Sequence, residues 1–204
     1  MKQDIIQFAA KYRTFISRIL VGFLFIFIFI SEGSWSNDRI LALMIDVFAF
    51  ILILICTFGR LWASIYICGY KEEAVISSGP YSMVRHPLYF FSFMGVLGLC
   101  LTTGNSVVTL VIMTTYIIYY PLVILDEEAT LKRKLGKKYE EFIKKTPRFI
   151  PNPALFKEPE HYTVYPKIFR RSLMDIVWFM GLYMILRVIN ILHEWDILPV
   201  LFHL

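Results

Sequence analysis

The sequence has few charged residues and little of the composition of a soluble enzyme. Only 18% of its 204 residues are Asp, Glu, Lys or Arg, whereas 57% are apolar, 17% are aromatic and the mean hydropathy is +0.61. A soluble domain of this length has too little interior volume to bury so much apolar surface, so the excess needs lipid. The composition therefore excludes a soluble enzyme and a disordered tail, and the length favours one compact unit.

Cysteine is also scarce, and the motifs of several common sites are missing. Cys56, Cys68 and Cys100 stand alone inside apolar stretches. Without a CxxC pair they predict neither a disulfide framework nor a zinc site, and the four histidines lack the short spacing of metal ligands. No glycine-rich dinucleotide turn follows a strand pattern, and no internal repeat is visible. We therefore expect no resident metal and interpret the cysteines as packing residues.

Long apolar stretches dominate what is present. In a helix that rises 1.5 Å per residue, about 20 apolar residues cross the ~30 Å hydrocarbon core of a bilayer. The candidate membrane helices are residues 15–30, 40–67, 88–101, 107–125 and 173–192. Turn-forming residues 102–105 join the third and fourth of them into a helical hairpin. The fold class predicted is an all-α integral membrane protein, a bundle of about five transmembrane helices.

A further helix is predicted on the cytosolic side, at residues 126–145. Its apolar residues Leu131, Leu135, Tyr139 and Phe142 recur at helical spacing, and Pro147 follows its end. Such an amphipathic helix is typical of a segment that lies on lipid head groups.

The distribution of lysine and arginine predicts the orientation in the membrane. Of these 21 residues, 18 lie in residues 1–18, 69–87 and 126–171. Because cytosolic loops carry the basic excess, we expect the N-terminus on the cytosolic side and the C-terminus on the opposite side. The net charge of +5 is then a topology signal and a surface for membrane lipids, and no nucleic acid partner is expected.

Three of the charged residues that fall inside the predicted spans are Arg60, Asp46 and Arg187. Arg60 lies in the inner half of the second span, where it either binds a phosphate or carboxylate or serves as a structural partner. Asp46 and Arg187 both fall toward the outer leaflet, and we expect them to neutralise each other.

Two polar clusters are predicted at the cytosolic face. In the first, at residues 78–89, Pro87 suits the first turn of a helix, which leaves Arg85 and His86 at a helix N-terminus that favours an anion. The second is the acidic triplet at residues 126–128, which directly follows a charge-free span. Alone, the first cluster also fits a positive-inside anchor and the second also fits the start of a cytosolic helix. Together they predict a surface for a cationic or hydroxyl-rich ligand.

The order and spacing of the residues in these clusters are specific. The series reads Gly79-x-Tyr81, Arg85-His86-Pro87-x-Tyr89, Glu127-Glu128-x-x-Leu131, Leu135-Gly136-x-x-Tyr139-x-x-Phe142 and Arg148-Phe149-Ile150-Pro151. It resembles the isoprenylcysteine carboxyl methyltransferase family and, more loosely, its phospholipid N-methyltransferase relatives. The likeness runs from about residue 66 to residue 151. It implies a single membrane methyltransferase domain over residues 1–204, with an extra C-terminal helix at about 173–192.

The resemblance implies an S-adenosylmethionine-dependent enzyme whose cofactor enters from the cytosol and whose lipidic or prenylated acceptor enters from the bilayer. Positions that match its cofactor-lining stretches are Glu73, Ala74, Val75, Ile76, Tyr81, His86, Pro87, Leu88, Tyr89 and Glu127. In this reading Glu127 accepts from ribose hydroxyls or an amine, and the rings of Tyr81 and Tyr89 face the adenine or the sulfonium. Arg85 and His86 are the candidate catalytic residues, with His86 where the methionine carboxylate meets a helix N-terminus.

The acceptor side departs from the family pattern. Eukaryotic members carry an arginine that binds the substrate carboxylate four residues before the first motif glutamate, and this chain has Val123 there. Arg60 and Arg148 are the candidate acceptor-binding residues, Arg148 because it matches a family position near the acceptor side.

The function predicted is methylation of the carboxylate of a prenylcysteine-like or other lipidic acceptor. A carboxylate acceptor is mildly favoured because an amine must first lose a proton, and His86 and the acidic cluster are the only obvious bases. The alternative is N-methylation or phosphate O-methylation of a phospholipid or other lipid head group. A non-catalytic membrane scaffold or small transporter is disfavoured, since transporters often show paired repeats.

Overall fold

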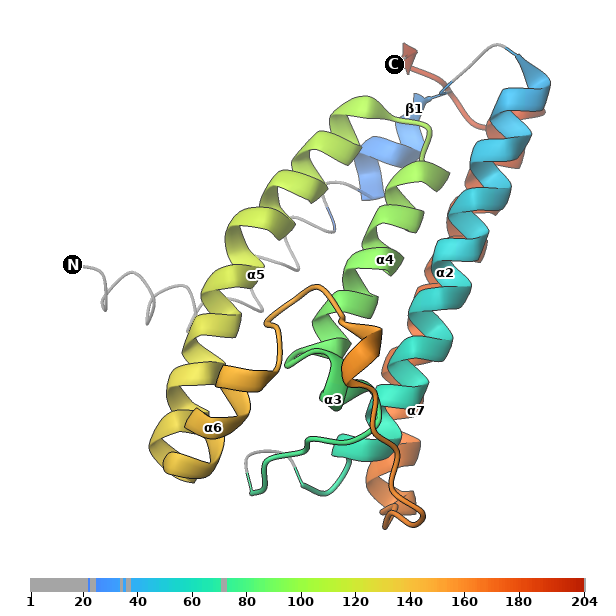
Figure 1. Ribbon diagram of the computed structural model, residues 1–204. Coiled ribbons are helices and arrows are strands. Elements are labelled where there is room, and N and C mark those ends of the chain that lie inside the picture. Colours follow the sequence, from blue (N-terminus) through green and yellow to red (C-terminus); the bar gives the residue numbers. More distant parts are fainter. Residues whose placement is uncertain (1–21, 23–24, 34, 36–37, 71–72, 204) are drawn as a thin grey trace. The chain divides into compact units, whose positions relative to one another are not determined.

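A computed structural model describes every residue of the chain except 1–21, 23–24, 34, 36–37, 71–72 and 204. Figure 1 shows the order of the elements along the chain. The long helices are α2 (Arg39–Ile67), α4 (Pro87–Thr102), α5 (Ser106–Leu135) and α7 (Pro166–Glu194). The short elements are β1 (Ser31–Glu32), α3 (Pro80–Met83), α6 (Lys137–Lys145), the 3₁₀ helix η1 (Pro153–Leu155) and β2 (Phe202–His203).

The all-α membrane class is confirmed. Within the described part of the chain, α2, α5 and α7 are long and apolar enough to cross a membrane, and α4 is a shorter apolar helix. At 29 or 30 residues each, the three long helices exceed the ~20 residues that a bilayer needs. They therefore tilt or project beyond the hydrocarbon core. The predicted helix at residues 15–30 lies largely outside the described residues. Within it the structure describes residues 22 and 25–30, and these are helical.

The predicted hairpin is confirmed, because α4 and α5 are joined by residues 103–105. Gly104 takes a positive φ of 63° at the turn. Asn105 then caps α5, since its side-chain oxygen accepts from the Val108 amide at 3.0 Å.

The cytosolic helix predicted at residues 126–145 is wrong in one respect, because it is not one helix. α5 continues through the acidic triplet to Leu135, and α6 begins at Lys137. Gly136 separates them with φ 56° and ψ −133°, a conformation that L residues avoid. Its amide still donates to the Lys132 carbonyl at 3.0 Å, which closes the last turn of α5.

The chain divides into two compact units. Unit 1 comprises residues 1–51, 96–126 and 182–204, and unit 2 comprises residues 52–95 and 127–181. The prediction of one methyltransferase domain over residues 1–204, with its core at about 66–151, stays a prediction.

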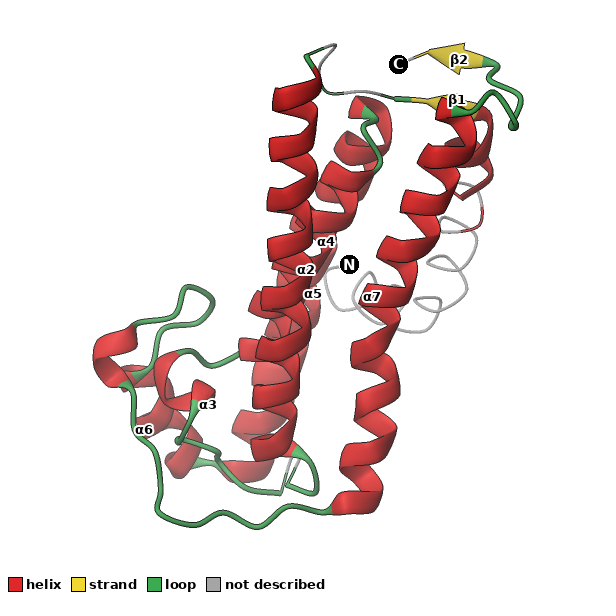
Figure 2. Cartoon of the chain, turned by 90° about the vertical axis from the view of Figure 1, so that its right-hand side faces the viewer, coloured by secondary structure: helices red, strands yellow, loops and turns green. Residues whose placement is uncertain are grey.

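Unit 1 has an apolar core and a short strand pair. Ile28, Val108, Leu186 and Ile189 are buried against one another. Strands β1 and β2 pair in parallel, and Figure 2 shows them side by side. The expected Asp46–Arg187 pair is confirmed, with the carboxylate accepting from the guanidinium at 2.8 Å.

Unit 2 holds the motif residues and has its own packing. The small residue Gly59 of α2 meets the ring of Phe91, and Gly95 of α4 meets Cys56 and Phe179. A Cβ at either glycine would lie within 2.5 Å of a neighbouring side chain, so glycine permits this close approach. Further along α2, Ala63 and Tyr66 pack against the buried side chain of Tyr81, which belongs to α3.

Candidate functional site

The turn that begins the first polar cluster is held by backbone geometry. Gly79 takes φ 57° and ψ −136°, and Pro80 then begins α3. The Ser82 hydroxyl donates to the Gly79 carbonyl at 2.7 Å. This geometry directs Tyr81 into unit 2, where its side chain is buried against α2.

A strap of chain, residues 153–165, covers this turn. The Gly79 amide donates to the Lys157 carbonyl at 2.7 Å, and the Lys157 amide donates to the Ser82 hydroxyl at 3.0 Å. The strap also contacts α2, because Tyr162 stacks on Tyr66 with ring centroids 4.8 Å apart. The strap therefore fixes the turn from a distant part of the sequence.

His86 and Pro87 form the start of α4 as expected. The His86 carbonyl accepts from the amides of Tyr89 and Phe90, each at 3.1 Å, and Pro87 occupies the first helical position. His86 is buried, and its ring centroid lies 5.7 Å from that of Tyr89. The motif thus brings an imidazole and a phenol together at a helix N-terminus.

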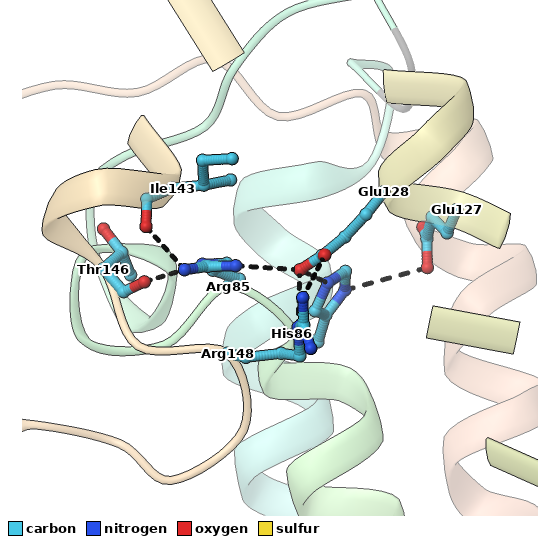
Figure 3. Close-up of polar contacts among 7 residues, drawn as sticks. All are labelled: Arg85, His86, Glu127, Glu128, Ile143, Thr146 and Arg148. Atoms are coloured by element: carbon cyan, nitrogen blue, oxygen red, sulfur yellow. Dashed lines mark hydrogen bonds and ion pairs between the residues drawn. The ribbon is translucent and has the colours of Figure 1, made fainter. Parts of the chain in front are cut away.

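Glu128 is the centre of the contacts drawn in Figure 3. Its Oε1 accepts from Arg85 Nη1 at 3.0 Å and from Arg148 Nε at 3.1 Å. Its Oε2 accepts from Arg148 Nη2 at 2.8 Å, and Oε1 lies 3.4 Å from His86 Nε2. One buried carboxylate therefore joins the two arginines and the histidine.

Arg85 extends this network to the end of α6. Its Nε donates to the Thr146 carbonyl at 2.7 Å, and its Nη2 donates to the Ile143 carbonyl. The guanidinium thus bonds carbonyl oxygens at a helix C-terminus, where a cation is favourable. Arg85 also borders an open cleft of about 560 Å³ walled by residues 143–147, 150–153 and 155.

Glu127 has different surroundings from its neighbour. Its Oε2 lies 3.8 Å from His86 Nδ1, on the opposite ring nitrogen from Glu128. This oxygen is buried and has no hydrogen-bond partner among the described residues. The two polar clusters predicted from the sequence therefore meet at His86.

Burial governs the electrostatics of this cluster. It lowers the pKa of His86 below 6.5, although Glu127 and Glu128 act in the other direction. The imidazole is therefore neutral at pH 7. Burial, helped by the charge of Glu127, also holds the pKa of Tyr81 well above 10, and burial raises the pKa of Tyr139 to about 12.

Buried polar atoms without a partner point to a missing ligand. Within the described part of the chain these atoms are Arg60 Nε, Tyr81 Oη, Glu127 Oε2 and Tyr139 Oη. All four belong to unit 2. A ligand with hydroxyl or ammonium groups suits Glu127, whereas an acceptor atom on a ligand suits Arg60 and the phenols.

The other predicted positions lie at varying distances from the cluster. Glu73 and Ala74 are exposed and Val75 is half-buried, whereas Ile76 and Leu88 pack against Ala63, Tyr66 and Tyr81. Arg148 is half-exposed and bonded to Glu128. The roles proposed for these residues remain predictions.

Sequence reasoning placed Glu128 in the acidic triplet and Tyr139 in the motif series, but it assigned no individual site role to Glu128, Tyr139 or Thr146. The doubled glutamate was a signal for Glu128, but adjacent residues on a helix point about 100° apart and the pattern does not say which one faces inward. Thr146 contributes a backbone carbonyl, which leaves no trace in residue type.

These features define a class of protein: an α-helical membrane protein with a buried histidine–carboxylate–arginine cluster at the N-terminus of a short membrane helix. The profile of the family described as phospholipid methyltransferase matches residues 39–138. The chain belongs to this family, which also includes the isoprenylcysteine carboxyl methyltransferases, and it is a membrane methyltransferase.

Three relatives illustrate the range of names in the family. The nickel-cobalt-cadmium resistance protein NccN of Alcaligenes xylosoxydans xylosoxydans is 31% identical over 95% of this chain and 90% of its own. The cobalt-zinc-cadmium resistance protein CzcN of Cupriavidus metallidurans is 30% identical over 94% of this chain and 88% of its own. The protein-S-isoprenylcysteine O-methyltransferase of Schizosaccharomyces pombe is 36% identical over 40% of this chain and 34% of its own. No solved structure matches the chain.

Proposed function

We propose that the protein transfers a methyl group from S-adenosylmethionine to the carboxylate of a lipidic acceptor, such as a prenylcysteine. The observation that supports this most is the pair of unpartnered buried oxygens, Glu127 Oε2 and Tyr81 Oη, beside the His86–Tyr89 ring pair. Membership in a methyltransferase family implies this methyl donor.

The residues present fit that donor. Glu127 offers a buried acceptor for ribose hydroxyls or an ammonium group, and Tyr81 and Tyr89 offer aromatic faces to a sulfonium. The N-terminus of α4 carries the positive end of the helix dipole, which suits a carboxylate. We assign Pro87, Leu88 and residues 73–76 to the walls of the same cofactor site.

Glu128, Arg85 and Arg148 position His86 in this scheme. The carboxylate fixes the imidazole through Nε2 and is itself fixed by both guanidinium groups. Arg85 therefore supports the site, because three of its donors already serve the chain. Arg148 keeps one edge exposed and stays our candidate for contact with the acceptor.

The chemistry asks little acid–base work of these residues. When bound, S-adenosylmethionine supplies an electrophilic methyl carbon on a sulfonium sulfur. An acceptor carboxylate forms the new O–CH₃ bond with an oxygen lone pair while the C–S bond breaks and leaves its electron pair on sulfur. No proton moves, so the chain has to align the two reactants and exclude water.

Ligand-induced stabilisation tests the donor site. In detergent, S-adenosylhomocysteine should raise the Tm of the protein, and Glu127→Ala or His86→Ala should abolish the increase. Asp126→Ala is the matched control, because it removes an adjacent but exposed carboxylate and should retain the increase. No shift of the wild-type Tm at millimolar ligand would contradict the proposal and favour a non-catalytic scaffold.

A phospholipid acceptor is the second candidate, and the description of the matching family favours it. An amine head group would need to lose a proton, and neutral His86 is the nearest base in the cluster. Transfer of labelled methyl groups should distinguish the two. Label on a farnesylcysteine analogue supports the carboxylate, whereas label on phosphatidylethanolamine alone overturns it.

A further inference from the structure

Arg60 occupies the interior of unit 2. It lies about two helical turns before the end of α2 and so within the apolar part of that helix. Its Nη1 donates to the Ser92 hydroxyl on α4, and its Cζ lies 5.3 Å from the ring centroid of Phe179 on α7. Three helices therefore enclose this guanidinium.

Within the described part of the chain, no carboxylate neutralises this guanidinium. Among the described residues, Arg60 forms no ion pair, and its buried Nε has no hydrogen-bond partner. Charged groups inside a membrane protein are ordinarily paired, because an isolated charge in a medium of low dielectric is unfavourable. Arg187, the other described arginine deep in a long apolar helix, follows that rule through Asp46.

A second unpartnered donor lies near Arg60. Ala63 is one turn further along the same face of α2, and Tyr81 is buried against it. The hydroxyl of Tyr81 has no partner within the described chain, and the positive charge of Arg60 is close enough to act on it. A guanidinium N–H can only donate, so the group that completes this pair must accept.

Tyr81 also lies close to Glu127, whose charge raises the pKa of the phenol. The carboxylate of Glu127 and the guanidinium of Arg60 are therefore both near enough to act on this phenol. Glu127 accepts hydrogen bonds, whereas Arg60 donates them. The two residues therefore suit two different ligand groups, both near Tyr81.

We propose that Arg60, with the hydroxyl of Tyr81, binds the oxyanion of the methyl acceptor, so that the acceptor is a lipid-soluble molecule carrying a carboxylate or a phosphate. The assignment of this anion site to the methyl acceptor rests on the proposed function. The depth of Arg60 in α2 implies that this anion arrives attached to an apolar chain.

The test compares anions with their neutral counterparts by thermal unfolding of the full chain in detergent. One arm uses N-acetyl-S-farnesylcysteine and its methyl ester, and the other uses phosphatidic acid and diacylglycerol. The anionic member of one pair should raise the Tm of the wild-type protein and its neutral counterpart should not. The arm that responds identifies the source of the oxyanion.

Arg60→Met keeps the length of the side chain and removes its charge. It should abolish the Tm increase given by the anion while keeping the increase given by S-adenosylhomocysteine. In turnover, the KM for the acceptor should rise by about tenfold to a hundredfold, the range for losing charged hydrogen bonds, with the KM for the methyl donor unchanged. Without ligand, its Tm should be at or above that of wild type, because an unpaired buried charge has been removed.

The double variant Asp46→Asn/Arg187→Met is the matched control, since it removes an intramembrane arginine together with its partner in unit 1. It should respond to the anion as wild type does. Equal Tm increases in wild type and Arg60→Met, or no preference of the wild type for either anion, would overturn the oxyanion site. Failure of S-adenosylhomocysteine to bind would instead overturn the proposed function, and the anion measurement would still decide the site.

Discussion

Glu127 and Glu128 are adjacent, and the protein gives them opposite surroundings. Glu128 is buried and accepts hydrogen bonds from two arginines, whereas the buried oxygen of Glu127 has no partner within the described chain. Stability should therefore depend on one and ligand binding on the other.

Glu128→Ala should destabilise the protein by about 3 kcal/mol, because it leaves Arg85 and His86 buried without their carboxylate. Glu127→Ala should change stability by less than about 0.5 kcal/mol and yet abolish the response to S-adenosylhomocysteine. Thermal unfolding of both variants, with and without ligand, measures the contrast. Equal losses of stability would show that the two carboxylates share one structural role.

The pH dependence of stability should contain a contribution from His86. Because burial lowers its pKa in the folded state, the unfolded state binds more protons near pH 6.5 and below. Its contribution to stability is therefore complete above the unfolded pKa and is lost as the pH falls through the folded pKa. His86→Gln should lose less Tm between pH 7 and pH 5 than wild type does. A steeper loss in His86→Gln would contradict a neutral buried imidazole.

At the scale of elements, two glycines with the same backbone conformation allow the free-energy cost of backbone strain to be distinguished from the cost of a side-chain clash. Gly79 and Gly136 have φ near 57° and ψ near −135°. A Cβ on Gly79 would lie 2.4 Å from the ring of Tyr66, whereas a Cβ on Gly136 would have open space.

Gly136→Ala should therefore cost about 1–3 kcal/mol from backbone strain alone. Gly79→Ala should cost about 1–3 kcal/mol more, because Tyr66 must also move. It should weaken binding of S-adenosylhomocysteine as well, since Tyr81 is held by this turn. Equal losses of unfolding free energy in the two variants would show that the Tyr66 side chain moves aside at no cost.

The sequence alone was sufficient to locate the long helices and to predict that the polar clusters at residues 78–89 and 126–128 contribute to one surface. Apolar length located α2, α4, α5 and α7, and Pro87 located the start of α4. The break at Gly136 was missed because glycine inside a charged, helix-favouring segment does not reveal a positive φ. The network around Arg85 was missed because two of its three acceptors are backbone carbonyl oxygens.

At the scale of the molecule, the distribution of basic residues predicts a definite orientation in the membrane. α6 carries exposed lysines and should face the cytosol, whereas the end of α7 should face the opposite side. The native cysteines are buried, so single reporter cysteines can be introduced without removing them.

Glu141→Cys should react with a membrane-impermeant maleimide only in inside-out vesicles. Glu194→Cys should react only in intact cells, and both positions are exposed in the fold. Labelling of both reporters from the same side would contradict an odd number of spans. Denaturation with detergent before labelling provides the control for reactivity.

The strap that crosses the motif turn has a consequence for biogenesis. The Lys157 amide bonds to the Ser82 hydroxyl, 75 residues earlier in the chain. During translation the turn that buries Tyr81 is made long before the segment that fastens it, so this corner of the protein can mature only after the intervening helices α4, α5 and α6 have been synthesised. A ribosome that stops before residue 157 would leave a nascent chain that has α2, α4 and α5 but lacks α7 and the segment that fastens the turn around Tyr81.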